Sequence, residues 1–220
     1  MSSVTLNKTY SEPIICQKEI LRYAGCKKAD SETDSLLNFC INEVKNKLTY
    51  KVCYREFPLK VKGDVCNFGS FELSSEKLAL NLVDSEKAII FAATIGVEID
   101  RLIAKYGRIS PSKALMLQAI GAERIEALCD TFCAELVMET GLFLTPRFSP
   151  GYGDLPLESQ KEIFSLLDCS RRIGLTLNNS LLMSPSKSVT AIVGLGGKKK
   201  PLKNKCSNCT KKDCAYRGAL

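Results

Sequence analysis

A continuous apolar segment, residues 88–93, sets the strongest limit on how this chain can fold. Six consecutive apolar side chains without alternation are typical of a fully buried strand. The apolar run extends to residue 97, but it then includes Thr94 and Gly96 and is too short to cross a bilayer. The sequence therefore predicts a buried strand within a globular domain and no membrane partner.

Periodic patterns on either side of this strand predict further elements. Apolar side chains recur every three or four positions in residues 34–48, which favours a helix. A long helix is expected from Pro111 to Thr140, because Pro favours a first turn and Gly141 a helix end. Further helices are predicted at residues 17–24, 77–83, 97–106 and 157–167, and strands at residues 50–57, 65–73 and 188–195, with a turn at 62–64 joining the first two strands. The mixture predicts an α+β fold.

Charge is distributed unevenly along the chain. Lys and Arg outnumber Asp and Glu by 31 to 24, which gives a net charge of +7. Residues 198–220 carry eight basic side chains and one acidic one, so residues 1–197 are neutral overall. We expect a globular domain at residues 1–197 and a basic, Cys-containing tail at 198–220. The short Lys run lacks interleaved aromatic residues, which favours a linker or an acidic protein partner over nucleic acid.

The composition excludes several kinds of chemistry. The chain of 220 residues has no His, which rules out imidazole acid–base catalysis, His-containing triads and His-ligated metals. It has eleven Cys, an odd number, and its first residues show no secretion signal. Reduced thiols in the cytoplasm are therefore expected, rather than a disulfide framework.

Three Cys of the tail, Cys206, Cys209 and Cys214, predict a metal site. A Cys-x-x-Cys turn lets two sulfurs reach one metal, and neighbouring Lys side chains would stabilise the thiolates. The fourth ligand can be another Cys, a small molecule or water, and both zinc and an iron–sulfur cluster fit the spacing. The alternative is a tail whose thiols bind nothing.

Some of the other Cys are expected to pack in the core, and others can either pack there or join the tail site. Cys40 lies on an apolar helix face, and Cys129 and Cys133 are one turn apart on the long helix, so core packing is expected for these three. Four more either pack in the core or complete the tail site: Cys26, Cys53, Cys66 and Cys169.

A loop rich in Pro and Gly, residues 146–156, forms the second candidate site. Arg147 offers a rigid charged fork for a carboxylate or phosphate. Gly151 permits close approach of the backbone to a ligand, and Tyr152 offers an aromatic face. This combination suits a zwitterionic, nucleotide-like ligand. The alternative is an ordinary surface loop with a solvated Arg.

From residue 147 to residue 193 the sequence resembles the reactivation domain of cobalamin-dependent methionine synthase. The resemblance is carried by the pattern R-x-x-P-G-Y at Arg147 to Tyr152, followed by Ile173-Gly174, Leu177-Asn178-Asn179-Ser180, Met183-Ser184-Pro185 and Ser188-Val189. Residues 91–96 and the long helix also resemble stand-alone members, which extends the likeness over residues 10–195. The resemblance implies a twisted antiparallel sheet flanked by helices.

The resemblance also implies a ligand, S-adenosylmethionine, held by Arg147, Phe148, Pro150, Gly151 and Tyr152. In the family the Arg pairs with the methionyl carboxylate, and neighbouring backbone groups contact the adenine. The implied function is repair, in which one electron and a methyl group from S-adenosylmethionine convert inactive cob(II)alamin into methylcobalamin. The domain supplies proximity, and the cofactor carries the chemistry.

The sequence departs from the larger enzymes of the family at several points. Those enzymes carry a carboxylate six residues before the Arg, where this chain has Gly141 and its nearest acid is Glu139. Gly153-Asp154-Leu155 replaces a Pro-Ala-Cys sequence. The larger enzymes fuse the domain behind substrate and cobalamin modules, whereas a stand-alone chain needs a separate cobalamin-bearing partner. The Cys tail is not part of their domain, and a cluster there would deliver the electron that a flavodoxin supplies to them.

We therefore expect a cytoplasmic accessory protein of the methionine synthase system that binds S-adenosylmethionine and reactivates a separate cobalamin-dependent enzyme. A close variant serves another corrinoid methyltransferase, since no motif identifies the methyl acceptor. A different class remains as the alternative, an interaction module that binds zinc or an iron–sulfur cluster and transfers no methyl group.

Overall fold

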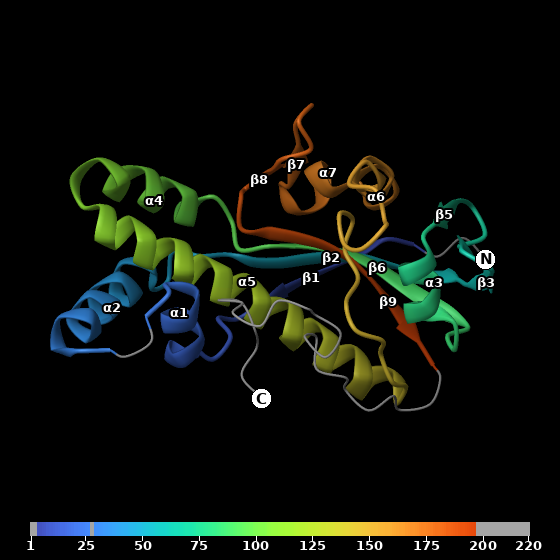
Figure 1. Cartoon of the computed structure of the whole chain (residues 1–220), viewed down its shortest axis with the longest axis horizontal. Helices are drawn as coiled ribbons and strands as arrows, with labels where there is room; N and C mark the ends of the chain where they lie inside the picture. The colour runs from blue at the N-terminus through green and yellow to red at the C-terminus, as the bar shows by residue number, and fades with distance from the viewer. Residues whose placement is uncertain (1–3, 27–28, 197–220) are drawn as a thin grey trace.

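A four-stranded antiparallel sheet forms the centre of the fold, in the order β1-β2-β6-β9 (Figure 1). The structure is a computed structural model that describes residues 4–26 and 29–196. The central strands are β1 (Leu6–Tyr10), β2 (Tyr50–Pro58), β6 (Lys87–Thr94) and β9 (Ser188–Leu195). Helices flank this sheet, so the expected α+β class is confirmed.

The remaining elements divide between the two faces of the sheet (Figure 1). One face is covered by α1 (Gln17–Tyr23), α2 (Ser31–Val44) and α5 (Pro111–Thr140), with α4 (Glu98–Ile109) packed on α5. The other carries α3 (Glu76–Leu82), α6 (Ser159–Leu167), α7 (Cys169–Ile173), a small sheet of β3 (Lys60–Lys62), β4 (Val65–Asn67) and β5 (Glu72–Ser74), and the hairpin of β7 (Thr176–Leu177) and β8 (Met183–Ser184).

Strand β6 is apolar from Ala88 to Ala93 because both of its faces are covered. Ile89 and Phe91 point into the core beneath α5, whereas Ala88 and Ile90 point into the core beneath α6 and α7. The predicted strand at residues 88–93 is therefore confirmed, together with the reason for its lack of alternation. No helix in the described ranges is both long enough and apolar enough to span a membrane.

Helix α5 lies across the sheet and is fixed there by aromatic packing. The ring of Phe132 lies 5.1 Å from that of Tyr54 on β2 and 5.0 Å from that of Phe91 on β6. Such tilted ring pairs stabilise a core beyond the area they bury. Gly141, in a left-handed conformation, ends the helix where the sequence predicted.

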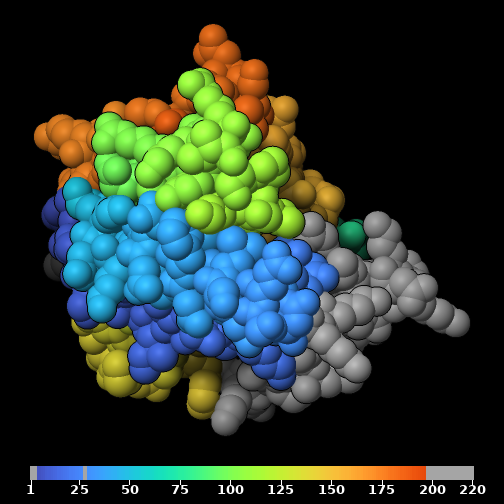
Figure 2. Space-filling view, turned by 90° about the vertical axis from the view of Figure 1, so that its left-hand side faces the viewer, coloured from blue at the N-terminus to red at the C-terminus, as the bar shows by residue number. Residues whose placement is uncertain are grey.

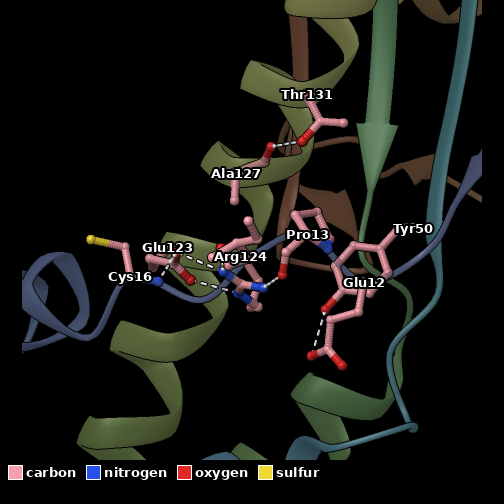
Figure 3. Close-up of polar contacts among 9 residues, drawn as sticks. Glu12, Pro13, Cys16, Tyr50, Glu123, Arg124, Ala127 and Thr131 are labelled. Atoms are coloured by element: carbon pink, nitrogen blue, oxygen red, sulfur yellow. Dashed lines mark hydrogen bonds and ion pairs between the residues drawn. The ribbon is translucent and has the colours of Figure 1, made fainter.

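A buried ion pair holds the chain that links β1 to α1 against α5 (Figure 3). Arg124 has no exposed surface, and its guanidinium bonds to both carboxylate oxygens of the adjacent Glu123. It also donates to the carbonyl oxygens of Pro13 and Ile14, at 2.5 and 2.8 Å. Glu123 in turn accepts from the backbone N–H of Cys16 at 3.0 Å. The pair thus satisfies three backbone groups that no secondary structure would satisfy.

At the start of α5, helix α2 lies against α4 and the first turn of α5 (Figure 2). The Tyr106 hydroxyl of α4 donates to Glu43 of α2 at 2.8 Å. The Lys113 ammonium of α5 lies 3.7 Å from the centre of the Phe39 ring. These contacts hold α2 against α4 and the start of α5.

Two predicted helices differ from their expected bounds by three or more residues at an end, and the one expected to reach residue 48 ends at Val44. The helix expected at residues 34–48 begins at Ser31, because the Asp30 carboxylate accepts from the Thr33 N–H at 2.8 Å and caps it. The helix expected to stop at Gly107 continues to Ile109, since this glycine is exposed and nothing crowds it.

The strand predicted at residues 65–73 is wrong. Two strands, β4 and β5, flank a turn in which Gly69 has φ +86°. The turn at residues 62–64 exists, but it joins β3 to β4 rather than β2 to β4. This part of the chain thus forms a separate sheet instead of extending the central one.

We predict that Arg124→Met lowers the free energy of unfolding by about 3–5 kcal/mol, because it leaves the Glu123 carboxylate buried without a cation. Arg101→Met is the control, since Arg101 pairs with Glu98 in a solvent-exposed ion pair and should cost less than about 1 kcal/mol. Urea denaturation of both variants measures the difference. Equal losses would contradict a dominant role for the buried pair.

Candidate functional site

The loop that follows α5 runs back along the free edge of β9. Leu144 and Phe148 form antiparallel bridges with Leu195 and Ile192. Phe148 exchanges two backbone hydrogen bonds with Ile192, at 3.0 and 2.8 Å. Between the two bridges, the Gly194 N–H donates to the Thr145 hydroxyl at 2.9 Å. The backbone around Arg147 is therefore held as an extension of the sheet.

The second half of the loop is fixed to the N-terminus of α3. The Asp154 carboxylate accepts from the Ser75 hydroxyl at 2.5 Å and from the Glu76 N–H at 2.7 Å. It also accepts from the Lys77 N–H at 3.2 Å. The hydrogen bond from Ser75, followed by the backbone donors, lowers the pKa of Asp154. This contact explains one departure from the larger enzymes, because Asp154 ties the loop to the helix.

Between these two anchors the chain makes a tight turn. Gly151 has φ +86°, and its N–H donates to the Leu155 carbonyl at 2.9 Å. A side chain is disfavoured there by the left-handed backbone and by Leu157, which a Cβ would approach to 3.3 Å. The glycine expected to allow close approach is therefore required by the turn itself.

The Arg147 guanidinium projects onto α5, where two carboxylates meet it. Its two terminal nitrogens donate to Asp130 at 2.5 Å and to Glu126 at 2.6 Å. These acids lie four residues apart, so both lie on one face of α5. The Arg147 side chain is only 15% exposed, compared with 41% for Glu126 and 72% for Asp130. Arg147 is thus a largely buried, paired cation, which differs from the alternative of a solvated surface Arg.

Two thiols of α5 line the inner side of this cation. Burial raises the pKa of both Cys129 and Cys133, although the positive charge of Arg147 opposes that rise. Both thiols therefore stay protonated at neutral pH and act as small apolar groups rather than nucleophiles. Cys129 is fully buried in the core, as predicted, and Cys133 is partly buried.

The other predicted ligand residues are placed differently from Arg147, and Phe148 packs against the core beneath α6 and α7. Tyr152 is exposed, and its ring meets that of Phe148 edge to face at a centroid distance of 6.3 Å. Pro150 is buried, and Gly151 is exposed. The loop therefore carries a largely buried cation that faces α5 and an exposed aromatic ring that packs on Phe148.

Neighbouring acids are arranged differently from what the sequence suggested. Glu139, the acid nearest to the loop in sequence, pairs with Lys8 of β1 at 2.8 Å. The carboxylates at Arg147 come from the middle of α5 instead. Spacing along the helix would have placed Glu126 and Asp130 on one face, but only the fold shows which loop they meet.

The predicted metal ligands Cys206, Cys209 and Cys214 lie outside the described residues. In the ranges that are described, no group of three or more Cys, Asp or Glu side chains could hold a metal ion. Three of the Cys that the sequence offers as a further ligand for the tail site are instead fully buried in the core beneath α6 and α7: Cys53, Cys66 and Cys169. Burial raises the pKa of Cys66 to about 11, which suits a packing role.

A cavity of about 280 Å³ lies apart from the loop, at the junction of β1 and β2. It contains none of the predicted site residues, and its lining consists of Thr9, Tyr10, Glu12, Asn46, Leu48, Thr49, Tyr50 and Lys51. The Tyr50 hydroxyl donates to Glu12 at 3.3 Å. The cavity therefore shares no side chain with the Arg147 loop.

Comparison with known proteins identifies the family of this chain. Residues 82–201 match the family described as vitamin B12 dependent methionine synthase, activation domain. The chain belongs to this family. The match spans α4, α5, the Arg147 loop and β9, whereas residues 13–16 and nearly all of α3, which also hold α5 and the loop in place, precede it.

Similarity at the level of structure extends beyond the matched residues. The activation domain described here is similar to a solved structure titled "Crystal Structure of the MetH Reactivation Domain bound to AdoHcy". The sequences are 16% identical, the TM-score is 0.65, and the alignment covers 90% of this chain and 80% of the other. This likeness shows a shared fold. A search of curated proteins finds no match.

We predict a pH-dependent role for Asp154 in holding the loop of this activation domain. Because its folded pKa is lowered, ionised Asp154 stabilises the fold above its ordinary pKa of about 3.9, and this contribution is lost as the pH falls through the folded value. Asp154→Asn should therefore be less stable than the wild type at pH 7, with a smaller difference at pH 3.

Denaturant unfolding at both pH values measures this effect. Glu158→Gln is the matched control, because Glu158 is an exposed acid just beyond the same loop whose side chain caps no helix, and it should cost little stability. A stability difference for Asp154→Asn that is the same at both pH values would contradict the prediction.

Proposed function

We propose that this chain binds S-adenosylmethionine at the Arg147 loop and presents it to a cobalamin held by a partner. The observation that carries the proposal is the largely buried guanidinium of Arg147, on a loop whose backbone pairs with β9. Membership of the activation-domain family makes a cobalamin-dependent methionine synthase the natural partner. AdoHcy, bound in the similar solved structure, is the product of methyl transfer from S-adenosylmethionine.

The residues of the loop suit separate parts of this ligand. Arg147 would bind the methionyl carboxylate through its terminal nitrogens. Tyr152 would contact the adenine through its exposed ring. The exposed backbone of Gly151 would contact polar groups of the adenine. Phe148 packs against the core beneath α6 and α7 and would support Tyr152 from below. Pro150, which is buried, would hold the turn in shape.

Binding in this loop would hold the ligand for reaction with the partner. S-adenosylmethionine supplies the methyl group, and one electron from a reductant completes the conversion of cob(II)alamin to methylcobalamin with release of S-adenosylhomocysteine. The chain's own contribution is to orient the sulfonium toward the partner and to supply proximity. We propose that the partner is a separate methionine synthase chain.

We propose the same division of the chain that the sequence predicts, an activation domain at residues 1–197 and a basic tail at residues 198–220. Its Cys206, Cys209 and Cys214 would hold zinc or an iron–sulfur cluster, and a cluster there would deliver the electron. Iron and zinc analysis after anaerobic reconstitution distinguishes the two metals.

Calorimetric titration with S-adenosylmethionine tests the ligand site. Arg147→Ala should weaken binding by roughly 10- to 100-fold, because it removes a charge-assisted contact with the carboxylate. Arg171→Ala is the control, since Arg171 is exposed on α7 and pairs with Asp168. Binding that is unchanged in Arg147→Ala would contradict the proposed site, and thermal unfolding of each variant checks that the fold is retained.

A further inference from the structure

The two terminal nitrogens of Arg147 are already bonded to carboxylates of the protein, and a ligand would have to compete with these. The Arg147 guanidinium already donates to Glu126 and Asp130, so both terminal nitrogens are engaged without any ligand. A ligand carboxylate gripped by both nitrogens competes with at least one of these acids. Each terminal nitrogen carries two hydrogens, so one acid can stay bonded while a ligand carboxylate is bound.

The two acids differ in how easily they can leave. Asp130 has a short side chain that is largely solvated, so breaking its ion pair costs little. Glu126 is less exposed than Asp130, at 41% compared with 72% of the side chain. Burial and, after it, the negative charge of Glu126 raise the pKa of Tyr23 on α1. Glu126 is therefore the acid held in place, and Asp130 is the one free to move.

The amino-acid end of the ligand needs both charges at once. Its carboxylate and ammonium are attached to one carbon, so a binding site must place an anion beside its cation. Gly141 supplies no carboxylate, and Glu139 is paired with Lys8. The acids that bond to Arg147 in the described part of the chain are Glu126 and Asp130.

We propose, building on the function above, that Glu126 accepts the ligand's ammonium and that Asp130 is a competitor displaced from Arg147 by the ligand's carboxylate. In the bound state Glu126, the ammonium, the carboxylate and Arg147 form a closed set of alternating charges. A ligand without the amino-acid group gains nothing from Glu126. Glu126 thus determines specificity for the α-amino acid, while Asp130 keeps the cation paired in the free protein.

The test is calorimetry on the full chain, with S-adenosylhomocysteine as the probe. This ligand has no net charge, so removing one negative charge from the protein has little long-range effect on its binding. Glu126→Gln should weaken binding by roughly 10- to 100-fold through loss of a charge-assisted hydrogen bond. Asp130→Asn should tighten binding, by up to roughly 5-fold, because the competitor is weakened.

Two controls make the result specific. Glu139→Gln makes the same charge change on the same helix, away from Arg147, and should leave affinity unchanged. 5′-Methylthioadenosine lacks the amino-acid group, so Glu126→Gln should not weaken its binding. If Glu126→Gln proves unstable in thermal unfolding, Glu126→Asp keeps the charge and should bind S-adenosylhomocysteine more tightly than Glu126→Gln binds it.

The outcomes separate this proposal from the one it builds on. No binding by the wild type, or binding indifferent to Arg147→Ala, overturns both. Binding that depends on Arg147 but is unaffected by Glu126→Gln overturns only the role of Glu126. Weaker binding in Asp130→Asn overturns the competitor role, because it would show that Asp130 contacts the ligand favourably.

Discussion

The buried pair of Glu123 and Arg124 fixes how α5 is rotated against the rest of the molecule. Arg124 reaches the backbone of residues 13–14, and Glu123 reaches that of Cys16. Residues three and seven positions beyond Glu123 lie on the same helix face, and these are Glu126 and Asp130. The interaction that anchors the segment before α1 therefore also determines which acids face the Arg147 loop.

The Arg147 loop supplies the cation of the site. Its backbone extends the sheet, so it is not a free segment. Its first part pairs with β9, and its second part is capped onto α3 through Asp154. Arg147 lies between these anchors, so its position is set by the backbone before any ligand arrives. A cation ordered in advance binds with a smaller loss of conformational entropy.

Sequence patterns could predict the elements whose signals are local. Strand β6 has a continuous apolar run, and α5 has Pro111 at its start and Gly141 after its end, so both are confirmed. Strand β1 was missed, because an edge strand is partly solvated and its Leu6 to Tyr10 segment carries no apolar run. Helix α4 was cut short at Gly107, since an exposed glycine in a helix costs only about 1 kcal/mol and need not end it.

The candidate site shows the same division between local and long-range information. Composition and spacing could identify the loop and its Arg, because Pro, Gly and Arg are recognisable within a few residues. The partners of Arg147 lie 17 and 21 residues earlier, on a helix whose rotation depends on contacts with residues 13–16. No local pattern predicts that pairing, so the buried state of Arg147 is visible only in the fold.

Methyl transfer to a partner tests the account most directly. The protein would be incubated anaerobically with methyl-labelled S-adenosylmethionine, a reductant and a cob(II)alamin-loaded methionine synthase that lacks its own activation domain. We predict labelled methylcobalamin with the wild type and loss of most label with Arg147→Ala. S-adenosylmethionine binding without any label on cobalamin, under conditions that reduce the cofactor, would contradict the reactivation function.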